Sequence, residues 1–240
     1  MDRNSNGYTF LFAGIMVVVV GALLAFAATS LKDLQDENVK KEKMQNILAS
    51  VGVSVDRDHA EKEFETVIKQ KLSLKVDGTV DESVSAFNID LKQELSKPAD
   101  KQLFPLYVAE KEGKKFYIIP LRGAGLWNAI WGYVALEEDL NTVKGAVFDH
   151  QGETPGLGAE ITQQWFQDRF VGEKIMDKSG EIVGITVAKG NTDPSKEDNK
   201  VDAISGATIT GDGVTAMIIE RLSHYKEYFS AQKSKLALNN

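Results

Sequence analysis

The uncharged apolar stretch 9–28 is the feature that most limits how this chain can fold. A helix of this length matches the roughly 30 Å hydrocarbon core of a bilayer at about 1.5 Å of rise per residue. No polar face interrupts the stretch, which argues against a buried core helix. A cleaved secretory signal is the other alternative, because Ala25-Phe26-Ala27 resembles a cleavage site. The leader 1–8 carries only Arg3 as a basic side chain and the apolar run is long for a signal, so we predict a retained transmembrane helix at 9–28.

The charges that flank this stretch do not settle its orientation. Lys32, Lys40, Lys41 and Lys43 follow it and only Arg3 precedes it, so a count of basic residues would place the C-terminal bulk in the cytoplasm. These lysines are mixed with acidic residues, however, and long domains translocate largely regardless of charge. The orientation stays open on charge alone.

The remaining chain is long and apolar enough for one large or two small domains with a real core, since 42% of the 240 residues are hydrophobic. The formal charge of −7 argues against nucleic acid as a partner, because binding phosphates needs basic patches. The absence of cysteine excludes disulfides, zinc–thiolate sites, iron–sulfur clusters and thiol nucleophiles. His59, His150 and His224 show no metal-ligand spacing, so we predict no metal site.

The periodicity of the chain predicts an α+β protein: one N-terminal transmembrane helix, then a mixed α/β domain with an antiparallel sheet. We expect a juxtamembrane helix and an α/β lobe over 29–100, the main domain over 101–230, and a tail at 231–240. Whether 50–100 forms a separate lobe stays open. Apolar spacing predicts helices at 32–49, 58–72, 165–170 and 214–229, and alternation predicts strands at 105–109, 116–120, 130–136, 143–149 and 182–188. Gly113-Lys114-Lys115 reads as a hairpin turn.

Three glycine-containing loops, 122–127, 152–158 and 205–213, lie between these strands and helices. None matches a Walker loop, a dinucleotide fingerprint or a nucleophile elbow, and no catalytic acid, base or nucleophile stands out. Glycines allow close backbone approach, and threonine hydroxyls donate hydrogen bonds. The loops therefore suit a flat ligand with a phosphate tail. We expect Thr154 and Thr210 to donate to it, and Leu126, Trp127 and Leu157 to cover its ring, although Trp127 would also suit core packing.

The third loop contains a run of small and hydroxyl residues, Ser205, Gly206, Ala207, Thr208 and Thr210, directly ahead of a helical pattern. Backbone N–H groups at a helix N-terminus favour an anion such as phosphate. Taken alone, such a run is more often an ordinary turn with an N-cap.

Four features in this order resemble a known family: the N-terminal anchor, LRGAGLWNAIWGYVAL, HQGETPGLGAEI and DAISGATIT. The chain resembles the family of FMN-binding NqrC subunits of sodium-translocating NADH:quinone oxidoreductases along its whole length. In that family a flavin transferase moves FMN from FAD onto the last hydroxyl of the pattern D-x-x-[S/T]-G-A-[T/S]. The resemblance implies a phosphodiester on Thr208, with Asp202, Ser205, Gly206 and Ala207 as the rest of the recognised pattern.

The resemblance also implies the surroundings and the role of the flavin. Thr154, Gly156, Leu157 and Gly158 would lie against it, with Lys189 as a weaker candidate for contact. We expect Thr210 to cap the helix or bond the phosphate. The chain would relay electrons within a multi-subunit complex that oxidises NADH, reduces ubiquinone and exports sodium. It would lie in the bacterial inner membrane, with its FMN domain on the extracytoplasmic (periplasmic) side where the transferase acts.

Two alternatives remain at this point. The RnfG-like component of the related Rnf ferredoxin-linked electron-transport complex has the same anchor and flavinylation pattern, but LWNAIWGY and the longer insert between anchor and core favour the sodium-pump family. A non-redox, membrane-tethered module that binds a phosphorylated ligand is the second alternative.

Overall fold

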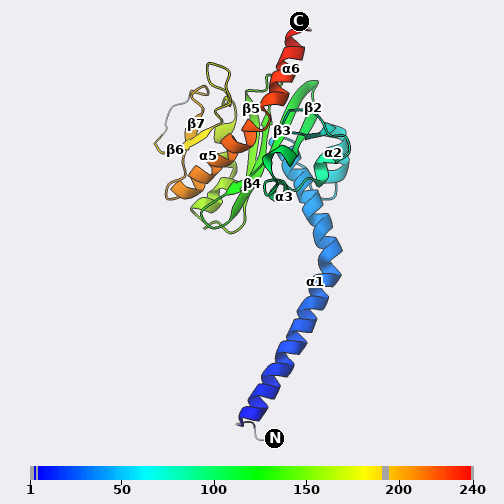
Figure 1. Ribbon diagram of the computed structural model, residues 1–240. Coiled ribbons are helices and arrows are strands. Elements are labelled where there is room, and N and C mark those ends of the chain that lie inside the picture. Colours follow the sequence, from blue (N-terminus) through cyan, green and yellow to red (C-terminus); the bar gives the residue numbers. More distant parts are fainter. Residues whose placement is uncertain (1–2, 4, 191–194, 239–240) are drawn as a thin grey trace. The chain divides into compact units, whose positions relative to one another are not determined.

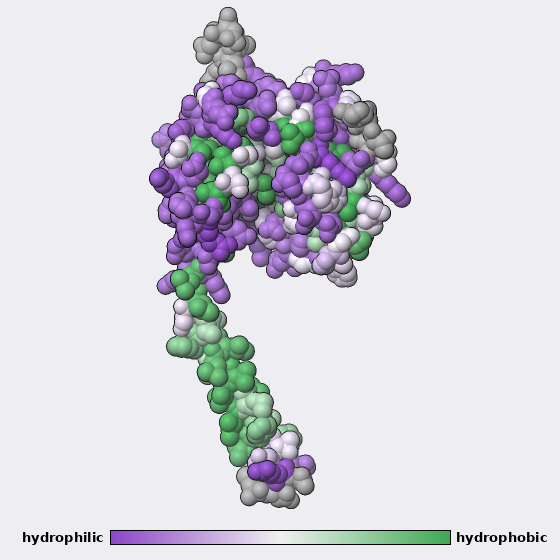
Figure 2. Space-filling model, turned by 180° about the vertical axis from the view of Figure 1, so that it is seen from behind, coloured by the Kyte–Doolittle hydropathy of each residue, from purple (hydrophilic) through white to green (hydrophobic). Residues whose placement is uncertain are grey.

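The computed structural model describes residues 3, 5–190 and 195–238. The chain divides into two compact units, Met1–Lys43 and Met44–Asn240. Helix α1, Asn6–Ser50, runs through the first unit and into the second. Within the described residues it is the one helix long and apolar enough to cross a membrane, and none of its apolar stretch is buried. Figure 2 shows hydrophobic residues along this part of the helix.

The second unit is built on an antiparallel sheet in which the strands pair in sequence order (Figure 1). The strands are β1 (Ile68–Leu74), β2 (Phe104–Lys111), β3 (Lys114–Ala124), β4 (Ala129–Leu136) and β5 (Val143–His150). The predicted fold class is confirmed: an N-terminal apolar helix precedes an α+β domain with an antiparallel sheet.

A two-residue turn joins β2 to β3, and both of its residues have positive φ, 54° at Glu112 and 74° at Gly113. This backbone matches the right-handed twist of the strands it connects, as in type I′ hairpins. The predicted hairpin is therefore confirmed, with its turn one residue earlier than expected.

Alternate residues of the strands bury against opposite faces of the sheet, as a period of two requires. Leu106, Ile119 and Val134 belong to the core cluster that includes helix α5 (Thr208–Ser223), which packs on β3. Their neighbours Tyr107, Ile118 and Ala135 belong to the cluster on the other face, with the end of α1 and helix α2 (Ala60–Val67). The sheet is thus the middle layer between two cores.

Shorter elements complete the second unit. They are η1 (Ala86–Asn88), α3 (Leu91–Glu94), η2 (Ala99–Lys101), η3 (Gly158–Thr162), α4 (Gln164–Gln167), η4 (Asp168–Phe170), β6 (Thr186–Ala188), β7 (Lys200–Asp202) and α6 (Lys226–Leu238). Strands β6 and β7 form a small parallel pair, and α5 packs against β6.

The predicted helix at 58–72 is wrong in its second half. Helix α2 ends at Val67, and Ile68 begins β1. The apolar spacing at the junction fits both periods, and pairing with β2, more than thirty residues later in the chain, decides in favour of the strand. Through this pairing, β1 joins the same sheet as the strands of the predicted main domain, so no separate lobe forms there.

The C-terminal helix and the last predicted strand are also shorter than expected. The helix predicted at 214–229 is divided, because α5 ends at Ser223 and α6 begins at Lys226. His224, between them, stacks on Phe104 with ring centroids 4.1 Å apart. Of the strand predicted at 182–188, only β6 forms. The helix predicted at 165–170 forms as α4 followed by η4.

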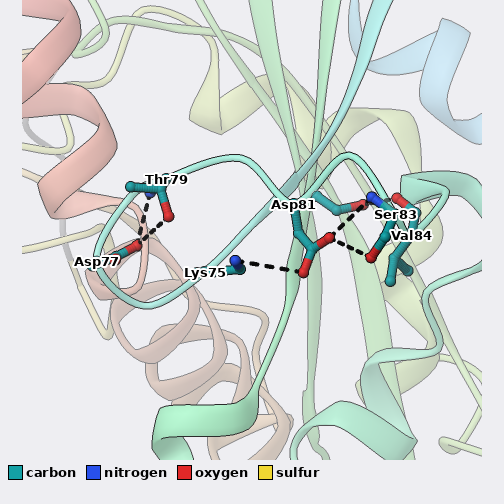
Figure 3. Close-up of polar contacts among 7 residues, drawn as sticks. Lys75, Asp77, Thr79, Asp81, Ser83 and Val84 are labelled. Carbon is teal, nitrogen blue, oxygen red and sulfur yellow. Dashed lines mark hydrogen bonds and ion pairs between the residues drawn. The ribbon is translucent and has the colours of Figure 1, made fainter.

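The loop after β1, residues 75–84, is closed by hydroxyls paired with carboxylates (Figure 3). Asp77 Oδ1 accepts hydrogen bonds from the N–H and hydroxyl of Thr79, at 2.9 and 2.6 Å. Asp81 Oδ1 accepts in the same way from Ser83, at 3.0 and 2.5 Å. We refer to residues 75–84 as the β1 loop.

Candidate functional site

Helix α5 begins directly after the run of small and hydroxyl residues, as predicted. Gly206 has a φ of 77°, a left-handed conformation that glycine adopts without strain. The next residue, Ala207, precedes the helix and offers no side-chain acceptor to its first N–H groups. Because these N–H groups have no partner within the helix, the start of α5 presents hydrogen-bond donors and the positive end of the helix dipole.

The two threonines of this turn differ in what their hydroxyls contact. Thr208 is the first residue of α5 and is exposed, and among the described residues none forms a hydrogen bond with its hydroxyl. Thr210, two residues later, is only 1% exposed and donates its hydroxyl to Glu153 Oε2 at 2.7 Å. The capping role predicted for Thr210 is therefore wrong, because Ala207 holds the capping position and the hydroxyl of Thr210 is engaged elsewhere.

A pocket of about 200 Å³ opens beside this turn and brings all three glycine-containing loops together. Its lining contains apolar side chains, glycines and hydroxyls; the lining residues are Leu126, Glu153, Thr154, Leu157, Gly158, Gly206, Ala207, Thr208, Ile209 and Thr210. Eight of the predicted site residues, from all three glycine-containing loops, are therefore together at one place.

Four predicted site residues lie outside the lining: Trp127, Gly156, Ser205 and Lys189. Trp127 is 67% exposed and its indole Nε1 donates to Thr154 Oγ1 at 3.1 Å, so it borders the pocket, and its alternative role in core packing is wrong. Gly156, with a φ of 76°, forms the turn of the second loop. Ser205 and Lys189 are both exposed, and Lys189 directly follows β6.

Glu153 is a site residue that the sequence did not reveal. It is 4% exposed, and its Oε1 accepts from the Trp127 N–H at 2.9 Å while its Oε2 accepts from Thr210. Burial acts to raise the pKa of this carboxyl, but the hydrogen bonds from Trp127 and Thr210 outweigh it and hold the pKa below its ordinary value. The pocket wall therefore contains an ionised carboxylate.

His150 fixes the loop that carries Glu153. Its Nδ1 accepts from the N–H groups of Gly152 and Glu153, both at 3.1 Å. Within the described residues, no group of three or more His, Asp or Glu side chains could hold a metal ion. His150 thus has a structural role in the loop.

Comparison with known proteins places this site in a family. Residues 125–223, which include the whole pocket lining, match the model of the FMN-binding domain family. The C subunit of the Na(+)-translocating NADH-quinone reductase of Pseudomonas aeruginosa is 31% identical, over 90% of this chain and 91% of its own length. The chain belongs to the NqrC family. The Yersinia pestis member is 30% identical over 89% of this chain and 87% of its own length.

Solved structures of the NqrC family agree with this assignment. The crystal structure of the Parabacteroides distasonis member is 38% identical, covers 83% of this chain and 97% of its own, and superposes with a TM-score of 0.76. NqrC of Shewanella oneidensis is 26% identical, covers 81% of this chain and 98% of its own, and superposes with a TM-score of 0.70. The resemblance found in the sequence is therefore confirmed at the level of the family and of the fold.

Proposed function

We propose that this chain is the electron-relaying NqrC component of a Na+-translocating NADH:quinone oxidoreductase and carries FMN bound covalently to Thr208 through a phosphodiester. One observation supports this site above all others. The hydroxyl of Thr208 is exposed and free of hydrogen bonds within the described residues, and it stands at the uncapped N-terminus of α5, in the wall of the pocket.

The residues of the pocket fit both parts of an FMN group. The first N–H groups of α5 would receive the phosphate, whose remaining negative charge the helix dipole stabilises. Leu126 and Leu157 supply apolar surface for a flat ring, and Thr154 supplies a hydroxyl beside them. Gly158 and Gly206 leave their part of the wall free of side chains.

The position of Thr208 also explains why it, and not Thr210, would be the acceptor. In the transfer, Thr208 Oγ1 would lose its proton and bond the phosphorus of the FMN half of FAD, while the bond from that phosphorus to AMP breaks. A transferase can reach a hydroxyl that is exposed, and no hydrogen bond of that hydroxyl has to be broken first. Thr210 meets neither condition, because it is buried and already donates to Glu153.

Bound FMN would supply the redox chemistry, and the chain would bind and orient it. No general acid or base is then required from the protein, in agreement with the lack of a catalytic constellation in the sequence. The partners would be the other subunits of the complex and, during maturation, a flavin transferase. The relatives described above carry the name of the sodium-translocating complex, which supports that assignment over the RnfG-like alternative.

We further propose that 9–28 anchors the chain in the bacterial inner membrane, with the FMN domain on the periplasmic side. The exposed apolar part of α1 supports the anchor. The orientation rests on the site of action of the transferase in the family, against the lysine count that follows the helix.

Flavin fluorescence tests the attachment site directly. The protein is expressed with a flavin transferase, denatured, and run on a gel that is viewed under ultraviolet light. We expect a fluorescent band for the wild type and for Thr210→Ala, and none for Thr208→Ala. The mass of the intact wild-type chain should increase by one FMN group. A band that persists in Thr208→Ala and disappears in Thr210→Ala would overturn the assignment.

A further inference from the structure

Glu153 connects three separate segments at the pocket. Its Oε1 holds the backbone of Trp127 in the first glycine loop, and its Oε2 holds the side chain of Thr210 in the first turn of α5. Its own loop is fixed through His150. A single buried carboxylate thus connects the first glycine loop and the first turn of α5 to its own loop.

Two glycines, Gly125 and Gly158, lie directly against the carboxylate of Glu153. A Cβ atom at Gly125 would lie 2.5 Å from Oε1, and one at Gly158 would lie no farther from Oε2. Real side chains do not approach so closely, so both neighbours have to be glycine while the carboxylate stays in place. The hydrogen bonds from Trp127 and Thr210 hold the charge beside the two glycines.

Glu153 is also the one charged side chain among the described residues that line the pocket. No lysine or arginine in this described lining offsets its charge, which is stabilised by hydrogen bonds from Trp127 and Thr210. Burial keeps water away from it, so its field in the pocket is screened much less than that of a surface carboxylate.

We propose that Glu153 is a positioning residue whose fixed negative charge lowers the reduction potential of FMN held in this pocket. The inference rests on the proposed function. A fixed negative charge raises the free energy of any state in which an electron has been added nearby. For charges roughly 10 Å apart at an effective dielectric constant of about 20, the ratio of oxidised to reduced flavin changes about tenfold.

Two substitutions separate the charge of Glu153 from its structural contacts. Glu153→Gln keeps the size of the side chain and removes the charge, so at a given potential we expect about tenfold more reduced flavin than in the wild type. Thr210→Val keeps the charge of Glu153 but removes one hydrogen bond that stabilises it. In this variant the reduction potential should fall, which favours oxidised flavin, and the change should be smaller than the rise expected for Glu153→Gln. Glu160→Gln is the matched control, because Glu160 lies in η3, directly after the loop of Glu153, but outside the lining, and it should change the potential little.

The experiment is a spectroscopic redox titration of the full-length flavinylated proteins, with covalent flavin confirmed on a gel for each. Shifts of similar size in the same direction for Glu153→Gln and Thr210→Val would indicate general loosening of the site and overturn the inference. An unchanged potential in flavinylated Glu153→Gln would overturn it and leave the proposed function intact. Absence of flavin on Thr208 in the wild type would overturn both. If Glu153→Gln does not fold, Thr210→Val decides: a lower potential supports the inference, and an unchanged or higher one refutes it.

Discussion

Among the described residues, the β1 loop and the turn before α5 both carry hydroxyls, and they differ in what those hydroxyls contact. In the β1 loop, the hydroxyls of Thr79 and Ser83 each donate to an aspartate two residues earlier (Figure 3). At the start of α5, Thr210 is paired in a similar way, but with a carboxylate from a distant loop. Thr208 follows Gly206 and Ala207, and its hydroxyl has no such partner among the described residues.

The comparison shows that a hydroxyl stays free to react only where no nearby side chain accepts its hydrogen bond. Local Asx-type pairing satisfies the hydroxyls of the β1 loop within a few residues of sequence. The turn before α5 has alanine and glycine where such an acceptor would stand, at Gly206 and Ala207. Small residues therefore have two effects here: they leave room for a ligand, and they provide no side-chain acceptor for the Thr208 hydroxyl.

The largest expected effect on stability distinguishes the glycines of the two turns. Gly78 in the β1 loop has a φ of 78°, and a Cβ there would lie 2.7 Å from the backbone N of Tyr228. Gly78→Ala combines an unfavourable φ with this steric clash, so we expect it to lower the free energy of unfolding by about 2–4 kcal/mol. Gly206→Ala also has an unfavourable φ, but its Cβ would meet only the flexible end of Leu157, so we expect about 1–2 kcal/mol.

Urea unfolding of the full chain in detergent measures both values. Flavinylation provides the second readout: Gly78→Ala should keep its fluorescent band, whereas Gly206→Ala changes the acceptor turn and should lower the extent of labelling. Equal labelling of the two variants would show that the β1 loop and the acceptor turn do not differ in the way described.

An intermediate effect is expected for the two paired threonines. Thr210→Val leaves the buried carboxylate of Glu153 with one hydrogen bond fewer, which should lower the free energy of unfolding by about 1–3 kcal/mol. Thr79→Val removes a hydrogen bond that is exposed to water, and should change stability by less than about 0.5 kcal/mol. The same unfolding measurement compares them. A larger cost at Thr79 would contradict the distinction between local and long-range pairing.

The smallest expected effect is the response of the β1 loop to acid. Hydrogen bonds from the side chain and backbone of Thr79 lower the pKa of Asp77 below 3.8, and those from Ser83 lower that of Asp81. A lowered folded-state pKa means that the stabilisation is complete above the unfolded-state value and is lost as the pH falls through the folded-state value. Asp77→Asn and Asp81→Asn should therefore lower Tm slightly near neutral pH, and the difference from wild type should disappear as the pH falls through the folded-state pKa values. A difference that persists in acid would exclude this origin.

Sequence patterns predicted the parts of the fold that depend on local order. Alternating apolar residues located β2 to β5, and Gly113 marked the hairpin between the first two. The hydroxyl run located the start of α5 to within a few residues. In each case the signal and the structure that it predicts lie in the same short segment of chain.

The parts that sequence did not predict depend on distant partners. Ile68 begins a strand only because β2 is available to pair with it. Glu153 looks like an ordinary surface residue, since nothing nearby in sequence shows that Trp127 and Thr210 will enclose it. A glutamate inside a glycine-containing loop is the one sequence signal that could have pointed to Glu153.

The order of the strands has a consequence for when the acceptor appears. The sheet is an uninterrupted meander from β1 to β5, so all of its pairings are available once His150 has been synthesised. Thr208 takes its place only when α5 docks on β3, and α5 lies close to the C-terminal end of the chain. Synthesis proceeds from the N-terminus, so the scaffold precedes the acceptor. The pocket is thus completed only after the strands that support it, and the proposed acceptor turn forms on a sheet whose strands are already available to pair.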